Sequence, residues 1–253
     1  MNLLKNISES MKSYFGLITI LALLSGIYVF LPQGDFLPAT MGAELPASKP
    51  MIALANFMLS LILYGGLGFA GMLLAKKLEF AEIWDLQITN KQRFLIPAVA
   101  GIGIGIFFII ADQIITPMHN LGHIPHPPFP ASLFASAIAG IGEEILFRLF
   151  FISFWLWLIS SVLLKHKWKT QVFWLVTCVS ALFFSIGHAP SAMMIFGLET
   201  LGELPTPLFF EIFLLNGTLS FFAAIFFRKY GFLAAVSVHF WTDIVWHVIW
   251  GLF

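Results

Sequence analysis

Seven long apolar stretches dominate this 253-residue chain and limit its fold more than any other feature. A membrane-spanning helix needs about 20 predominantly apolar residues. Only 10% of the residues are charged, whereas a soluble domain carries about 25%. The sequence therefore predicts an all-α fold, a polytopic transmembrane bundle of about seven helices that forms one membrane domain over residues 1–253. The expected spans are 14–32, 51–75, 94–116, 131–162, 172–188, 206–227 and 232–252.

Two further segments have a distinct composition. Residues 76–92 mix charged and apolar side chains, which predicts an interfacial amphipathic helix on one membrane surface. Glycines cluster in the second and third expected spans, where no phosphate-binding lysine accompanies them, so we expect faces of close helix packing. These glycines are Gly65, Gly66, Gly68, Gly71, Gly101, Gly103 and Gly105. The single cysteine, Cys178, excludes an internal disulfide, and the net charge of zero gives no indication of a nucleic-acid partner.

Basic residues gather in alternate linkers, which predicts the orientation in the membrane. One set of linkers holds Lys5, Lys12, Lys76, Lys77, Lys91, Arg93, Lys165, Lys167, Lys169, Arg228 and Lys229. The other set holds only Lys49. The positive-inside rule then places the N-terminus in the cytoplasm and the C-terminus outside a bacterial-type cytoplasmic membrane. A re-entrant half-helix within 189–205 would not change this orientation.

The fourth expected span carries three ionisable residues, which are costly inside a bilayer unless they have partners or a function. Glu143 and Glu144 are adjacent and point roughly 100° apart on a helix. Glu144 and Arg148 are four residues apart and can pair on one face. Arg148 would then neutralise one carboxylate and leave the other free to act as a general base. The alternative is an ion pair that only holds helices together, which accounts for Glu144 better than for Glu143.

Two later spans add further polar groups. His188 is expected at the end of the fifth span, just before Pro190. His239, Asp243 and His247 follow one another at intervals of four residues, so they form one polar stripe that must face protein or water. A structural Asp–His pair and a cation path are alternative interpretations of this stripe. Taken together, the three spans offer a base, an assisting imidazole and polar donors, which are the groups that hydrolysis needs.

The chain lacks the patterns of the other common intramembrane hydrolases. It contains no G-x-S-x-G element for a serine nucleophile and no H-E-x-x-H zinc helix. Asp112 and Asp243 lack the sequence context of aspartyl intramembrane proteases.

The ordered polar motifs resemble the CPBP family, the CAAX proteases and bacteriocin-processing enzymes also called Abi proteins. Its pattern is EExxxR, then FxxxH, then HxxxN or HxxxD, each on a separate span. The corresponding residues here are Glu143, Glu144 and Arg148, then Phe184 and His188, then His239 and Asp243. The resemblance covers about 131–247, the expected catalytic core.

The resemblance implies an intramembrane endopeptidase. Glu143 and His188 would activate water, and His239 and Asp243 would bind the oxyanion. Glu144 and Arg148 would order the base or the substrate. Phe184 and His247 are expected beside the substrate or behind the catalytic groups.

The same resemblance leaves the cofactor open, because the family has been described both as metalloproteases and as metal-free glutamate-dependent enzymes. We expect no cofactor and assign no metal ligand, with zinc as the alternative. The third motif ends in Asp243 rather than Asn, and an aspartate must be protonated or paired with His239 to take part in oxyanion binding. His247 is an additional histidine that would tune Asp243 or partly replace His239.

The expected partners are the lipid bilayer and a membrane-anchored protein or peptide precursor, such as one with a C-terminal sorting or propeptide tail. Counted along the spans, the polar groups lie between the midplane and the outer surface, so water is expected from outside. This disfavours a prenylated CAAX tail, which is cytoplasmic. A proton-coupled transporter and a non-catalytic scaffold or immunity protein remain as alternatives. The outer loop with His119, His123 and His126 is interpreted as a connector rather than a lid or metal site.

Overall fold

The computed structural model describes residues 8–33 and 47–253, and all regular secondary structure within them is helical. Seven helical segments in these ranges are long and apolar enough to cross a membrane, which confirms the predicted bundle of seven spans. They are Glu9–Tyr28, Lys49–Lys77, Lys91–Met118, Ala131–Leu163, Lys169–Phe196, Thr206–Tyr230 and Phe232–Leu252. Lys5, one of the residues used to predict orientation, lies outside the described residues.

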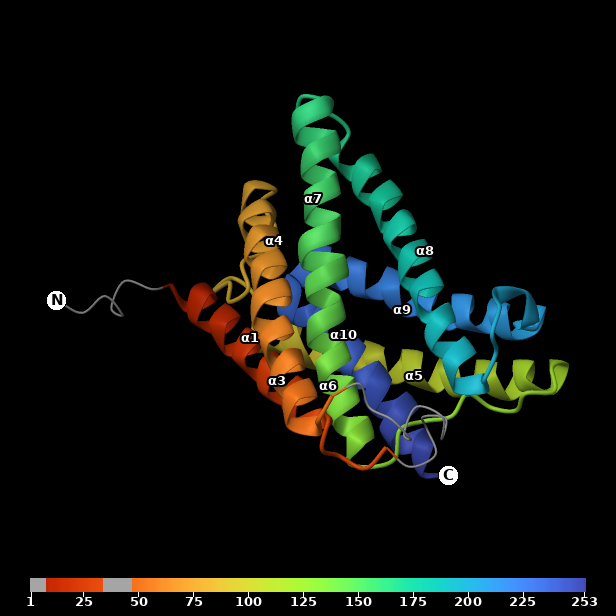
Figure 1. The fold of residues 1–253 in the computed structure, drawn as a ribbon. Coiled ribbons are helices and arrows are strands. Elements are labelled where there is room, and N and C mark those ends of the chain that lie inside the picture. Colours follow the sequence, from red (N-terminus) through yellow and green to blue (C-terminus); the bar gives the residue numbers. More distant parts are fainter. Residues whose placement is uncertain (1–7, 34–46) are drawn as a thin grey trace.

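Several spans are built from consecutive helical elements with different hydrogen-bond patterns. The α-helices are α1 (Glu9–Tyr28), α3 (Lys49–Leu59), α4 (Gly65–Lys77), α5 (Ile96–Ile115), α6 (Ala131–Glu144), α7 (Ser153–Leu156), α8 (Lys169–Phe196), α9 (Thr206–Tyr230) and α10 (Phe232–Asp243). The π-helical segments are η3 (Ser60–Tyr64), η4 (Lys91–Leu95), η6 (Ile145–Ile152), η7 (Trp157–Leu163) and η9 (Ile244–Ile249). Three short 3₁₀ segments are η5 (Thr116–Met118), η8 (Leu201–Glu203) and η10 (Trp250–Leu252). In Figure 1, the fourth span from α6 through α7 forms one continuous helix, drawn in green.

The last span lies at the centre of the bundle. Of its 18 most apolar consecutive residues, 61% are buried inside the protein, whereas the corresponding fraction for the second span is 17%. Its main element, α10, packs against α5, α6 and α9. A polar stripe on α10 therefore faces other helices rather than lipid.

Glycines allow α10 to approach its neighbours closely. A Cβ atom at Gly101 or Gly105 of α5 would clash with backbone or side-chain atoms of the last span, and one at Gly140 of α6 would lie 3.3 Å from the Phe240 nitrogen. The predicted packing role is thus confirmed for Gly101 and Gly105, whereas Gly103 has nothing within 4 Å of an added Cβ.

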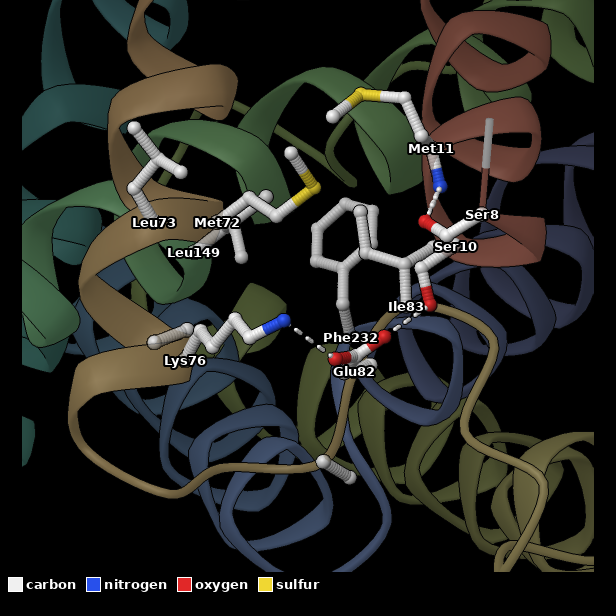
Figure 2. A pocket seen from close by; sticks show the side chains of 12 residues that line it. Ser8, Ser10, Met11, Met72, Leu73, Lys76, Glu82, Ile83, Leu149 and Phe232 are labelled. Carbon is white, nitrogen blue, oxygen red and sulfur yellow. Dashed lines mark hydrogen bonds and ion pairs between the residues drawn. The ribbon is translucent and has the colours of Figure 1, made fainter. Parts of the chain in front are cut away.

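The predicted amphipathic helix over 76–92 is wrong, because residues 79–89 form turns rather than a helix. Contacts with distant residues hold this loop instead. The Ser10 hydroxyl donates to the Glu82 carboxylate at 2.9 Å, and Lys76 pairs with the same carboxylate at 3.1 Å. Both contacts lower the pKa of Glu82, the hydrogen bond from Ser10 most. Figure 2 shows them in the lining of a pocket between α1 and α4, which is separate from the polar site described below.

The fifth span differs from expectation at its C-terminal end. His188 and Pro190 were expected at the end of the helix, but α8 continues through both to Phe196, with Gly197 as its left-handed cap. Proline removes one backbone donor from a helix, and membrane helices tolerate this where neighbouring groups compensate. The proposed half-helix in 189–205 is therefore not separate: its first eight residues belong to α8.

Candidate active site

Glu144 lies between a histidine and an arginine in the interior of the bundle. Its Oε1 atom is 2.8 Å from His239 Nδ1, and its Oε2 atom is 3.2 Å from Arg148 Nε. The side chains of Glu144 and Arg148 are both fully buried. The expected pairing of Glu144 with Arg148 is present, and it extends across the bundle to α10.

Glu143 has a different environment, although it is adjacent in sequence. Its Oε2 atom is 3.9 Å from His188 Nε2 and 3.8 Å from His239 Nε2. Its side chain remains 32% exposed, although the Oε2 atom itself is buried and has no hydrogen-bond partner among the described residues. The end of α6 thus directs one carboxylate toward the buried arginine and the other toward two imidazoles and an open space.

The ring of His188 is oriented by the helix that carries it. Its Nδ1 atom lies 2.7 Å from the carbonyl oxygen of Phe184, which can only accept a hydrogen bond, so Nδ1 is the donor. Its Nε2 atom then faces Glu143 with a free lone pair when the ring is neutral. The buried Phe184 ring lies 4.8 Å from the His188 ring and 5.9 Å from the His239 ring, and thus packs against both imidazoles.

On α10, His239 contacts all three acidic residues of the site. Besides Glu143 and Glu144, its Nε2 atom lies 3.5 Å from Asp243 Oδ2. Of the two states considered for Asp243, pairing with His239 is the one that agrees with this geometry. His247 lies one turn further on, and its nearest polar contact is His126 of the loop before α6, at 3.1 Å between Nδ1 atoms.

Two hollows meet at Glu143. The first has a volume of about 880 Å³ including its open mouth and is lined by Glu143, His188, His239, Asp243 and His247 together with apolar side chains of α5, α8 and α9. The second, about 790 Å³ including its mouth, lies between α1, α3, η3 and α6 and is lined by Tyr28, Asn56 and Tyr64 among others. Arg148 lines neither hollow and contacts the group around them through Glu144.

Sequence reasoning missed some polar residues around the first hollow. Asn216 of α9 lines it directly. Glu211, one and a half turns earlier on α9, is fully buried beside His119. Both lie in an expected span, where any polar residue signals a partner or a cavity. That signal was available in the sequence, but no motif drew attention to these positions.

The carboxylates and imidazoles of the site are also groups that bind metal ions in other proteins. Among residues 8–33 and 47–253, no group of three or more His, Cys, Asp or Glu side chains is arranged to hold a metal ion. The separations of 3.8–3.9 Å around Glu143 are too long for direct hydrogen bonds, and one water molecule beside the pair could contact both carboxylate and imidazole.

These features define a multi-pass membrane protein in which ionisable side chains from three spans meet at a water-accessible cavity. Residues 125–245, which contain all of those side chains except His247, match the family model described as Rce1-like, type II CAAX prenyl endopeptidase Rce1-like. The match confirms the predicted relationship to the CPBP/CAAX protease family and supports a CAAX-type intramembrane protease. Comparison with curated proteins and with solved structures gave no match.

Proposed function

We propose that this chain is a metal-free intramembrane endopeptidase in which Glu143 is the general base. The observation that supports this most strongly is the position of Glu143 in the lining of one cavity, with its unpaired Oε2 atom within 3.9 Å of two imidazole nitrogens. A water molecule between Glu143 and His188 would donate one hydrogen to each. General base catalysis of this kind contributes about 10²–10⁴-fold to a rate.

The proposed reaction proceeds in two steps. Glu143 takes a proton from the water as its oxygen attacks the scissile carbonyl carbon, which produces a tetrahedral oxyanion. His239, with a proton on Nε2, donates to this oxyanion, while Glu144 and Asp243 stabilise the positive imidazolium. The carbon–nitrogen bond then breaks, and Glu143 passes its proton to the leaving amine.

The buried pair behind the site has a positioning role in this scheme. Glu144 holds His239 through Nδ1, which leaves Nε2 to face the cavity, and Arg148 neutralises Glu144. Without Arg148, the buried Glu144 carboxylate would lack a fixed positive charge whenever His239 is neutral.

The substrates we propose are membrane-anchored protein or peptide precursors. The hollow lined by Tyr28, Asn56 and Tyr64 offers polar groups to an extended backbone, and it shares Glu143 with the hollow that the histidines line. With the predicted orientation, the cavity opens toward the outer side of the membrane, which favours secreted or lipoprotein-like precursors over cytoplasmic prenylated tails.

The function is tested by mapping new N-termini in membranes that contain the full-length protein. Substrate-rich membranes are incubated with the purified wild type or with Glu143→Gln, each with and without a metal chelator, and newly formed N-termini are identified by mass spectrometry. We expect cleavage products with the wild type and a loss of about 10²-fold or more with Glu143→Gln. The exposed variant His166→Gln serves as a matched control. Cleavage that stops with chelator would contradict the metal-free chemistry, and equal cleavage by Glu143→Gln would exclude the assigned base.

A further inference from the structure

The segment 119–126, here called the histidine loop, connects η5 to the stretch before α6 and contacts three different spans through its three histidines. His119 faces α9, His123 faces α5, and His126 faces η9. Each contact joins residues from distinct parts of the fold, and none of them is used in the catalytic scheme above.

The contact of His123 is the shortest of the three. Its Nδ1 atom lies 2.5 Å from Asp112 Oδ2 and 3.1 Å from the Thr116 hydroxyl. Asp112 is fully buried at the end of α5, whereas the His123 side chain is 51% exposed. The loop therefore brings a partly exposed imidazole, that of His123, into contact with the buried carboxylate of Asp112.

His119 and Glu211 form a second, more deeply buried contact. Their side chains are 1% and 0% exposed, and His119 Nε2 lies 3.8 Å from Glu211 Oε2. No lysine or arginine in the described residues forms an ion pair with Glu211, so His119 is the basic group nearest to it that the structure provides.

His126 is the third histidine of the loop, and it contacts the last span next to the candidate active site. Its Nδ1 atom lies 3.1 Å from that of His247, and its ring packs edge-on against Trp246 at 4.7 Å. Burial lowers the pKa of His126 to about 3, so this imidazole is neutral near pH 7. A neutral ring can share a hydrogen bond with His247 without charge repulsion.

Between these anchors, two loop residues form part of the catalytic cavity. Ile124 and Pro125 line the same hollow as Glu143, His188 and His239. Ile124 also packs against the apolar clusters around Phe108 and around Leu208. Both residues therefore border the space that a substrate of the proposed reaction would enter.

We propose that His119, His123 and His126 are positioning residues that hold Ile124 and Pro125 as a wall of the substrate cavity. The loop is then a docked element that helps to bind substrate, rather than the plain connector expected from the sequence. The role in substrate binding rests on the proposed protease function, whereas the docking itself does not.

The docking of the histidine loop is measured by an experiment that does not depend on cleavage activity. The probe is a water-soluble maleimide that reacts with Ile124→Cys in a Cys178→Ala background of the full-length protein. We expect His123→Ala to raise the labelling rate about fivefold, the factor expected when one hydrogen bond is lost. Asn120→Ala is the matched control, because Asn120 is exposed in the same loop, and it should leave the rate unchanged. Equal labelling in the His123→Ala and control proteins would overturn the proposal.

The substrate role is measured by steady-state kinetics on a cleaved precursor, with the histidine variants in the otherwise native chain. We expect His123→Ala to raise KM several-fold with kcat nearly unchanged, the pattern of lost substrate binding. His123→Gln should bring KM part of the way back to the wild-type value, because the glutamine amide can still donate a hydrogen bond to Asp112. A fall in kcat with constant KM would overturn the assignment of the wall to substrate binding. If the wild type cleaves nothing, the protease proposal fails, while the labelling result still decides whether the loop is docked.

Discussion

Glu143 and Glu144 are neighbours in sequence, yet the fold gives them different chemistry. One side chain is buried against Arg148 and His239, and the other is partly exposed beside two imidazoles. The sequence predicted this division, because adjacent helical residues point in different directions and only Glu144 is four residues from Arg148. It did not predict the link from Glu144 to His239, which joins residues 95 positions apart.

Asp243 occupies the last position of the HxxxN or HxxxD motif, where this chain has aspartate rather than asparagine. Its carboxylate lies 3.5 Å from His239 Nε2, and in the proposed mechanism it stabilises the imidazolium rather than donating a hydrogen bond itself. We expect Asp243→Asn to keep activity within about tenfold, because the amide can donate directly to the oxyanion. Asp243→Leu should lower kcat about 10²-fold or more, because leucine can neither stabilise the imidazolium nor donate a hydrogen bond to the oxyanion. Steady-state kcat values of the two variants check this, and a larger loss in Asp243→Asn than in Asp243→Leu would contradict it.

At the scale of helices, apolar runs predicted every span, but the ends and linkers depended on contacts that a sequence does not reveal. The 79–89 loop resembled an amphipathic helix, yet Arg93 donates to the carbonyl oxygens of Asp85 and Ile88 and stabilises turns there. Pro190 was interpreted as a helix terminator, but α8 continues beyond it. Likewise, the partners of the histidine loop belong to α5, α9 and η9, so its docking was not predictable from the loop alone.

The close approach of α5 and the last span gives a prediction at this scale. A Cβ at Gly105 would lie 2.5 Å from the Val245 Cβ and 2.9 Å from the Thr242 carbonyl oxygen. We expect Gly105→Ala to destabilise the fold by about 1–3 kcal/mol through overpacking. Gly103→Ala on the same helix should be neutral or slightly stabilising, because nothing lies within 4 Å of its added Cβ. Thermal unfolding in detergent compares the two, and equal Tm values would contradict the packing described here.

For the whole molecule, the seven spans among the described residues predict that Glu9 of α1 and the C-terminal end of the last span lie on opposite sides of the membrane. Basic residues favour a cytoplasmic N-terminus, and the cavity is lined by the 124–125 segment at the end of the bundle predicted to be external. In a Cys178→Ala background, we expect Asn120→Cys to react with an impermeant maleimide in intact cells. His166→Cys, in a linker at the predicted inner side, should react only after permeabilisation. The reverse pattern would place the cavity mouth in the cytoplasm and restore prenylated tails as candidate substrates.

The central claim is that the carboxylate of Glu143 and the imidazole of His188 act together on one water molecule. The most direct test is a double-mutant cycle on the cleavage rate, with Glu143→Gln, His188→Gln and the double variant in the same membranes. Residues that act as a unit are strongly non-additive, so we expect the double variant to be about as slow as the slower single variant. Losses that multiply in the double variant, or a single variant with wild-type rate, would contradict the shared water.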